Sequence, residues 1–180
     1  THVHAKVAVI LDFDTMYGVE IPCSIQKRMN YMNEVEYYYR YFNEHNIPVD
    51  VLPASADLSG YKLVVAPMLY MLTEAFGKEL TRFVRDGGTL VTTYYSGMAD
   101  LNDCIYPGGY PGVLKEACGI WVEETDALTA KQHNTAVTGA ELGFETFSCG
   151  YMCDIMHLEG AKCLASYGED FYAGTPCITE

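Results

Sequence analysis

Three acidic residues follow the first buried stretch of the sequence and are the first side chains that could carry chemistry. The stretch from Lys6 to Asp12 reads KVAVILD, a continuous apolar run rich in β-branched residues, which predicts a strand buried on both faces of a parallel sheet. Ligands of open parallel sheets bind at the carboxyl ends of the strands, which is where Asp12, Asp14 and Glu20 stand. Acids at such places also cap helices and solvate loops, and no phosphate loop or metal-ligand partner accompanies these three in the sequence. We therefore favour a structural role for them over a catalytic one.

The glycines Gly108, Gly109 and Gly112 lie in the run YPGGYPG, which shares some of its composition with a nucleotide-binding loop. The run lacks the Gly-Lys-Ser/Thr ending of a P-loop and does not join a strand directly to a helix. Pro107 and Pro111 also remove two of the backbone N–H donors that such a loop needs. Phosphate binding is therefore not expected here.

Cys149, Cys153 and His157 are spaced four residues apart, and this spacing would place three metal ligands on one face of a helix. Gly150 and the surrounding aromatic residues argue against a regular helix at this place. The chain has seven cysteines, an odd number scattered through a domain too large to need disulfides, which favours reduced thiols. Such a thiol is usually a small buried apolar group, and we expect neither a metal nor a cofactor.

An alternation of strands and helices must position these residues. Further strands are predicted at 49–52, 62–66 and 89–94, and amphipathic helices at 26–45 and 73–86. Thr73 is a predicted N-cap, and Gly87-Gly88 ends the second helix. The residues expected on the buried faces are Met32, Val35, Tyr39 and Phe42 in the first helix and Phe76, Leu80, Phe83 and Val84 in the second. This order predicts an α/β fold with a doubly wound parallel sheet of the flavodoxin-like or class I glutamine amidotransferase-like kind.

The C-terminal part of the sequence has a different pattern. A short helix at 113–118 is expected to lead into a strand at 120–123. Beyond residue 125 only short alternating stretches occur, such as 144–147 and 163–167, and glycines separate them, which predicts β-structure. We expect a single domain over 1–180, with an α/β core at 1–123 and a β-rich extension at 124–180.

The turn after the strand at 89–94 is where a class I glutamine amidotransferase-like domain places its nucleophilic cysteine. Here the turn reads Tyr94-Tyr95-Ser96-Gly97-Met98, so Tyr95 stands at the position of the nucleophile, and no His-x-Glu pair follows to activate it. Ser96 is the remaining candidate, and without an evident base it reads as a turn residue. The scaffold resembles an amidotransferase while the chemistry is missing.

Composition and charge exclude several kinds of partner. Hydrophobic residues make up 49% of the 180-residue chain, enough for a sizeable core. The 24 acidic and 11 basic residues give a net charge of −13, which repels nucleic acid and anionic membranes. The longest apolar runs are too short to span a bilayer and the start of the sequence lacks the regions of a signal peptide, so a cytoplasmic location is expected. Because the sequence begins at Thr1 without Met, we expect it to be a piece of a longer protein.

Ordered segments along nearly the whole chain resemble the middle domain of glycoside hydrolase family 42 β-galactosidases. They are IPVDV (47–51), DLSGYKLVVAP (57–67), GGTLV (87–91), SGMADLND (96–103), GGYPG (108–112) and YGEDFYAGTP (167–176). The resemblance implies a parent enzyme with an N-terminal (β/α)8 barrel, this α/β domain in the middle and a small C-terminal β domain. It also implies that the middle domain builds a homotrimer and that both catalytic glutamates belong to the barrel. This chain then has no catalytic residue of its own and meets a β-galactoside only through its parent.

The long loop from Ser96 to Gly112 holds the residues that we single out as binding or interface candidates. A loop of this length is usually functional or disordered, and it must gain contacts that offset its ordering entropy. The candidates are Asp100, Asn102, Asp103, Tyr106 and Tyr110. We expect this loop to lie at the carboxyl ends of the strands and to face the barrel of a neighbouring subunit; a solvated surface loop is the alternative.

Two rival functions remain open beside an oligomerisation module. One is a stand-alone enzyme of the amidotransferase-like class, which a glutaminase or esterase assay would reveal. The other is a small-ligand-binding flavodoxin-like domain, which would carry a bound flavin with a visible absorbance spectrum.

Overall fold

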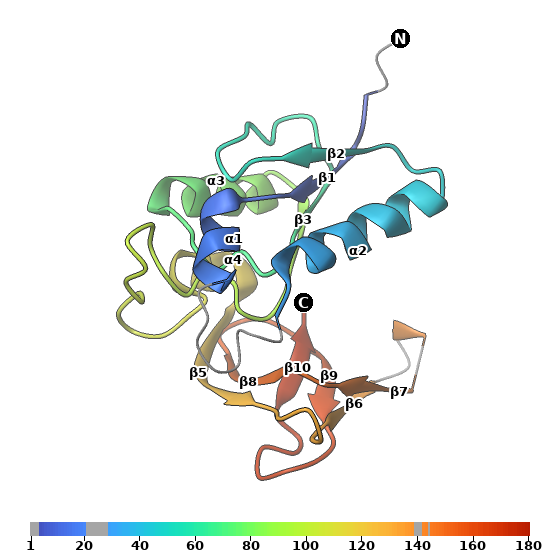
Figure 1. The fold of residues 1–180 in the computed structure, drawn as a ribbon, viewed down its shortest axis with the longest axis vertical. Coiled ribbons are helices and arrows are strands. Elements are labelled where there is room, and N and C mark those ends of the chain that lie inside the picture. The colour runs from blue at the N-terminus through green and yellow to red at the C-terminus, as the bar shows by residue number, and fades with distance from the viewer. Residues whose placement is uncertain (1–3, 21–28, 139–141, 144) are drawn as a thin grey trace.

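A four-stranded parallel sheet forms the centre of the α/β part. The computed structural model describes residues 4–20, 29–138, 142–143 and 145–180. The strands are β1 (Val7–Ile10), β2 (Val49–Leu52), β3 (Leu63–Ala66) and β4 (Thr89–Thr92), in the order β2-β1-β3-β4 (Figure 1). All neighbouring pairs are parallel, with Val7 in register with both Val49 and Leu63. The predicted parallel α/β core is confirmed.

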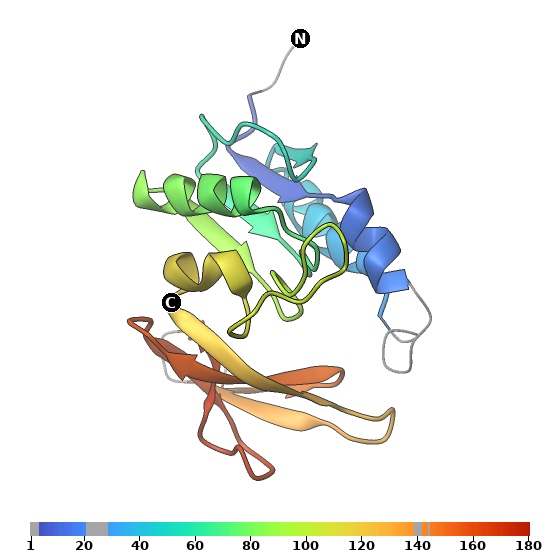
Figure 2. The ribbon, with the colours of Figure 1, turned by 90° about the vertical axis from the view of Figure 1, so that its left-hand side faces the viewer.

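Helices cover both faces of this sheet, and β1 is buried between them. They are α1 (Phe13–Glu20), α2 (Tyr31–Glu44), α3 (Glu74–Arg85) and the short turn of η2 (Gly112–Leu114) and α4 (Lys115–Cys118). Val7 and Val9 of β1 pack with α1 and α2, whereas Ala8 and Ile10 pack with α3 and η2. Figure 2 shows the sheet between these two helical layers. The continuous apolar pattern of β1 follows from this double burial.

Helix α3 follows its sequence signals at both ends. Thr73 Oγ1 accepts a hydrogen bond of 3.1 Å from the backbone N–H of Phe76, as an N-cap does. At the other end Gly87 adopts a φ of 92°, and the N–H of Gly88 bonds to the carbonyl of Phe83 at 2.9 Å. A glycine is favoured at this left-handed position because it has no Cβ to clash.

Helix α2 differs from its prediction in its start and in its buried face. Asn30 caps it by accepting the N–H of Asn33; of the predicted earlier turns, residues 26–28 lie outside the described part of the chain. The residues that pack toward the sheet are Tyr31, Val35, Tyr38 and Phe42, whereas the predicted Met32 and Tyr39 are exposed. Because residues 37–39 are all tyrosines, the residue pattern alone could not show which of the three rings faces inward.

Helix α1 was not predicted and occupies the stretch in which the acids follow β1. The carboxylate of Asp12 accepts the N–H of Thr15 at 2.8 Å and so begins the helix. Inside it, Gly18 lies close to the side chains of Met71 and Tyr70. Among the described residues, none of the helices is long and apolar enough to cross a membrane.

The C-terminal part consists of two antiparallel sheets that lie beside the α/β part (Figures 1 and 2). One pairs β5 (Ile120–Ala127) with β8 (Met152–Leu158). The other has the order β10-β9-β6-β7, from β6 (Asn134–Thr138), β7 (Thr146–Cys149), β9 (Cys163–Tyr167) and β10 (Pro176–Thr179). The predicted β-rich character is confirmed, and the strand at 163–167 has its predicted bounds. The division that we expected between residues 123 and 124 falls inside β5, which runs on to Ala127.

Candidate functional site

The loop from Ser96 to Gly112 follows β4 and is bound to the segment that follows β3. Its backbone bonds to that segment run from Gly97 N to Leu69 O at 2.8 Å and from Leu72 N to Ala99 O at 2.9 Å. Ser96 is buried, and its hydroxyl accepts the N–H of Leu69 at 3.0 Å. The loop therefore begins at the carboxyl edge of the sheet, with Ser96 in a structural turn.

Asp100 organises the tip of this loop. Its Oδ1 accepts the backbone N–H groups of Asn102 at 2.8 Å and of Cys104 at 3.0 Å. These bonds to the ionised form lower the pKa of the Asp100 carboxyl below its usual value. An aspartate that accepts neighbouring N–H groups in this way closes a tight turn.

Two further candidates tie the loop to the segment after β3. Asp103 has a φ of 59°, and its Oδ1 accepts the hydroxyl of Tyr70 at 2.6 Å. The hydroxyl of Tyr106 donates to the carbonyl of Leu72 at 2.5 Å. Both bonds join residues more than 30 positions apart in the sequence, so they hold the loop in one place.

The last two candidates have different surroundings. Tyr110 is buried against Ile120 and Val122 under the start of β5, and its backbone pairs with Val122. Asn102 is exposed at the tip. The structure thus places all five candidates in one braced loop but does not gather them around a common cavity.

Two exposed apolar side chains at the loop tip were missed by the sequence reasoning. Leu101 is 51% exposed and Ile105 is 56% exposed. They flank Asp103 in the sequence, and the Asp103 side chain accepts a hydrogen bond from Tyr70. Large apolar side chains in an otherwise polar turn are the sequence signal that could have found them, because exposed apolar surface often marks a contact site.

Tyr95 occupies the turn after β4 in a backbone conformation that is unusual for its type. Its φ is 65°, a left-handed value that non-glycine residues rarely adopt. The ring is buried and stacks on Tyr70 with centroids 4.8 Å apart. A nucleophile must be presented at the surface of its turn, whereas this side chain is packed inside.

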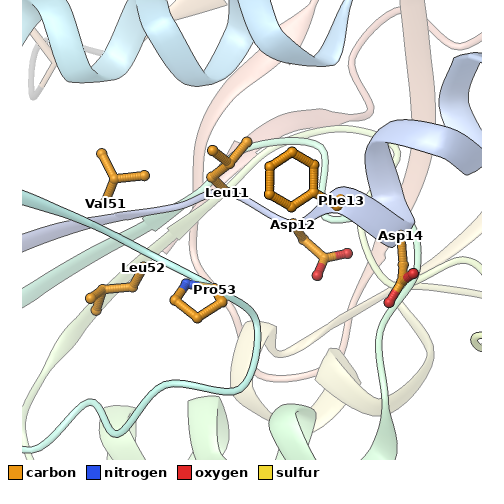
Figure 3. A pocket seen from close by; sticks show the side chains of 7 residues that line it. All are labelled: Leu11, Asp12, Phe13, Asp14, Val51, Leu52 and Pro53. Carbon is orange, nitrogen blue, oxygen red and sulfur yellow. The ribbon is translucent and has the colours of Figure 1, made fainter.

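Asp12 and Asp14, two of the three acids after β1, line a cavity of about 350 Å³ (Figure 3). Its lining comes from the carboxyl ends of β1 and β2 and from the start of α1: Leu11, Asp12, Phe13, Asp14, Val51, Leu52 and Pro53. Asp12 already accepts the N–H of Thr15, and Glu20 lies at the far end of α1. The three acids are therefore not brought together, and Asp12 serves as a helix cap.

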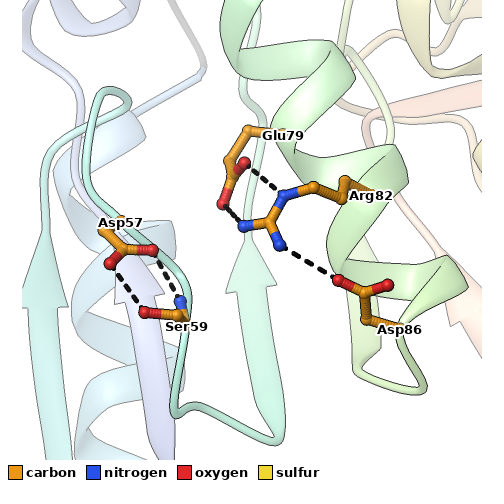
Figure 4. A network of polar contacts seen from close by, with 5 residues as sticks. All are labelled: Asp57, Ser59, Glu79, Arg82 and Asp86. Carbon is orange, nitrogen blue, oxygen red and sulfur yellow. Dashed lines mark hydrogen bonds and ion pairs between the residues drawn. The ribbon is translucent and has the colours of Figure 1, made fainter.

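A second cavity of about 380 Å³ lies between the loop after β2 and helix α3. Its one arginine, Arg82, bonds to Glu79 at 2.6 and 2.9 Å and to Asp86 at 3.0 Å (Figure 4). The nearby carboxylate of Asp57 accepts both the N–H and the hydroxyl of Ser59. Since acidic partners already occupy the guanidinium, this cavity is poorly suited to phosphate.

The structure does not assemble Cys149, Cys153 and His157 into the metal site that was considered. Cys149 ends β7, whereas Cys153 and His157 belong to β8, so no helix aligns them. His157 instead bonds to Glu123 at 2.6 Å and stacks on Trp121. In the part of the chain that the structure describes, no three His, Cys, Asp or Glu side chains are placed to share a metal ion.

Comparison with known proteins assigns the family. The family model described as "Beta-galactosidase trimerisation domain" matches residues 5–180. The chain belongs to this family. The resemblance of ordered segments over nearly the whole chain is therefore confirmed.

Relatives of known sequence are β-galactosidases much longer than this trimerisation domain. The domain is 43% identical over 176 residues to "Beta-galactosidase LacZ" of Lactobacillus acidophilus, covering 98% of the domain and 26% of that protein. It is also 43% identical over 185 residues to "Beta-galactosidase Pbg" of Clostridium perfringens, covering 99% of the domain and 27% of that protein. The domain thus spans about a quarter of the length of these relatives.

Solved structures share its fold closely. The β-galactosidase of Rahnella sp. R3 superimposes with a TM-score of 0.93 at 41% identity, over 99% of the domain and 27% of that chain. Gan42B, a GH42 β-galactosidase of G. stearothermophilus, does so with a TM-score of 0.91 at 33% identity, over 99% of the domain and 26% of that chain. The arrangement of the parallel sheet and the antiparallel sheets is therefore that of glycoside hydrolase family 42 β-galactosidases.

Proposed function

We propose that this domain joins three copies of a cytoplasmic β-galactosidase into a homotrimer and takes no direct part in hydrolysis. The observation that carries the proposal is the match of the trimerisation family to residues 5–180. The parent would hydrolyse terminal β-galactosides with the carboxylates of its catalytic barrel. The partners of the domain would then be the other copies of itself and the catalytic barrel of the parent enzyme. Nucleic acid and membranes would not be partners.

The loop from Ser96 to Gly112 is the surface that we propose to meet a neighbouring subunit. Its support is the combination of a braced backbone with apolar side chains directed to solvent: Asp100 and Tyr70 hold the tip, while Leu101 and Ile105 are exposed. A surface that is rigid before contact loses little conformational entropy on association. Because each side chain is about half exposed, burial of the remainder would contribute about 1 kcal/mol, roughly half of the value for a fully exposed side chain.

The test places a carboxylate at the loop tip of the β-galactosidase that carries this domain. Leu101→Asp and Ile105→Asp are expected to raise the trimer dissociation constant at least about tenfold, because each removes an apolar contact and buries an unpaired charge. The measurement is size-exclusion chromatography with light scattering over a dilution series. Ile47→Asp is the matched control: Ile47 is also exposed and apolar, but it precedes β2 at the opposite edge of the sheet.

The thermal unfolding of the monomeric unit separates the alternatives. Neither loop variant should change it, since both side chains are exposed. If the trimer stays intact in both variants, the loop is a solvated surface and does not contact a neighbouring subunit. Kinetics that change while the trimer persists would place the loop at a neighbour's sugar site instead.

We also propose that the α/β core is a class I glutamine amidotransferase-like scaffold, flavodoxin-like in its strand order, without a working nucleophile. Its support is the order β2-β1-β3-β4 together with Tyr95 at a φ of 65° in the turn after β4. The expected result is no glutaminase activity above that of a thiol-blocked sample. Activity that a thiol reagent removes would favour a stand-alone enzyme, and a bound flavin would favour a ligand-binding domain.

A further inference from the structure

Several thiols meet in the small core between the two antiparallel sheets. Cys153 is 0% exposed and packs with Leu128, Tyr167 and Tyr172. Cys149 and Cys177 are partly buried against the same cluster. The side chains of Cys149 and Cys153 are within hydrogen-bonding distance of each other, although they belong to different sheets. Such proximity is the first requirement for a disulfide.

We infer that Cys149 and Cys153 form a reversible disulfide when the protein meets hydrogen peroxide, with Cys149 as the attacking thiol and Cys153 as the resolving thiol. This modification site is independent of the proposed trimer contact. It also differs from the metal site considered for the same cysteines, because it needs neither His157 nor a third ligand.

The two thiols are unequal in a way that sets their roles. Cys149 is half-buried, and the hydrogen bond from Cys153 lowers its pKa below the usual value. Cys153 lies fully inside the core, and its hydrogen bond to Cys149 together with burial raises its pKa. A thiolate that solvent can reach is the one that reacts with peroxide, whereas a buried thiol beside it can react only with its neighbour.

The other thiols of the described chain are less suited to this pairing. Burial raises the pKa of Cys177 to about 12 and that of Cys118 to about 11, so both stay protonated. The Cys163 thiol contacts the carbonyl of Ala165 and lies 3.4 Å from the Ser166 hydroxyl. Cys104 is exposed in the loop after β4, far along the chain from this cluster.

The reaction takes place in two steps and needs only peroxide as oxidant. The Cys149 thiolate attacks one peroxide oxygen, the O–O bond breaks, and the departing hydroxide takes up a proton to become water, which leaves a sulfenic acid on Cys149. The Cys153 sulfur then attacks the Cys149 sulfur, an S–S bond replaces the S–O bond, and the second water carries away the Cys153 proton. Two thiols lose two electrons and two protons in all, and a dithiol reductant reverses the change.

The bond would join the two antiparallel sheets through one short link. Cys149 is the last residue of β7, an edge strand of the four-stranded sheet, and Cys153 lies in β8 of the other sheet. Oxidation should therefore slow hydrogen exchange of the β7 amides. A ring of only five residues constrains the unfolded chain little, so the chemical state of the thiols is the more direct measurement.

Peptide mapping of the full 180-residue chain tests the proposal. Trypsin cuts after Lys131 and Lys162, and the peptide between them contains Cys149 and Cys153 but no other cysteine. After brief peroxide treatment, denaturation and alkylation, neither cysteine of this peptide should carry an alkyl group, and the peptide should be two hydrogen atoms lighter than its unalkylated dithiol form. When the sample is reduced before alkylation, both cysteines should carry an alkyl group. Oxygen added to Met152 or Met156 in the same peptide changes the mass differently.

Cys104 provides the internal reference, and two variants check the roles. In Cys153→Ser, a dimedone label should trap the sulfenic acid on Cys149; in Cys149→Ser, Cys153 should stay unmodified. Full alkylation of Cys149 and Cys153 at a peroxide dose that oxidises Cys104 would overturn the proposal, and so would a disulfide from Cys149 to Cys177. Because the map of the unmodified sequence needs no variant, the test holds even if a serine at position 153 prevents folding.

Discussion

Replacement of Asp154 by Asn is expected to stabilise this domain at neutral pH. Burial raises the pKa of the Asp154 carboxyl from its ordinary 3.8 to about 6, even though Thr125 Oγ1 donates a hydrogen bond to it at 2.8 Å. The folded state therefore binds this proton more tightly than the unfolded state does. The resulting stability is fully present below the unfolded pKa and is lost as the pH rises through about 6.

The size of the effect follows from the difference between the two pKa values. A difference of about 2 pKa units corresponds to about 3 kcal/mol in the free energy of unfolding. Asparagine has nearly the same shape and can still accept the Thr125 hydrogen bond, but it cannot ionise. The free energy of unfolding of the variant should therefore exceed that of the unchanged sequence by about 3 kcal/mol at pH 7.5. This difference should shrink as the pH falls toward 4.

Urea unfolding followed by circular dichroism at both pH values measures this gap. With a denaturant slope of about 2 kcal/mol/M, the unfolding midpoint at pH 7.5 should rise by about 1.5 M. Glu159→Gln, at an exposed acid, is the control and should leave the midpoint unchanged at either pH. An equal gap at the two pH values, or none at pH 7.5, would refute the reasoning, because ionisation of Asp154 would then cost nothing in the folded state.

Two further substitutions test how the loop and helix α3 are held. Tyr70→Phe removes the hydroxyl bonded to Asp103 and should lower the free energy of unfolding by about 1 kcal/mol, seen as a fall in melting temperature of about 3 °C. The control Tyr17→Phe, at an exposed tyrosine, should not change the melting temperature. A Tyr70→Phe variant that melts at the same temperature as the unchanged sequence would contradict the assigned bond. Gly77→Ala would place a Cβ 2.3 Å from Val113 Cγ2 and should destabilise the domain by about 1–3 kcal/mol. In a chain that also carries Val113→Ala, Gly77→Ala should cost no more than about half as much stability. If Gly77→Ala costs the same with valine and with alanine at position 113, the contact with Val113 is not the cause of the loss.

The sequence by itself determined the elements whose signals lie in neighbouring residues. The unbroken apolar run of β1 showed a strand covered on both faces, and Thr73 and Gly87 marked the ends of α3. Ordered segments along nearly the whole chain identified the family. These features are local in the chain, because strand burial, helix capping and left-handed turns depend on residues a few positions apart.

Only the tertiary structure decided which distant residues meet. The sequence offered Asp103 as an interface residue but did not show its bond to Tyr70, 33 positions away, which only the fold forms. It offered Cys149, Cys153 and His157 as a possible trio, but the strand arrangement separates His157 and leaves the two thiols together. Within α2, the tertiary structure decided that Tyr38 rather than Tyr39 faces the sheet. Such contacts depend on strand order and on the path of loops, and neither is set by the periodicity of a single segment.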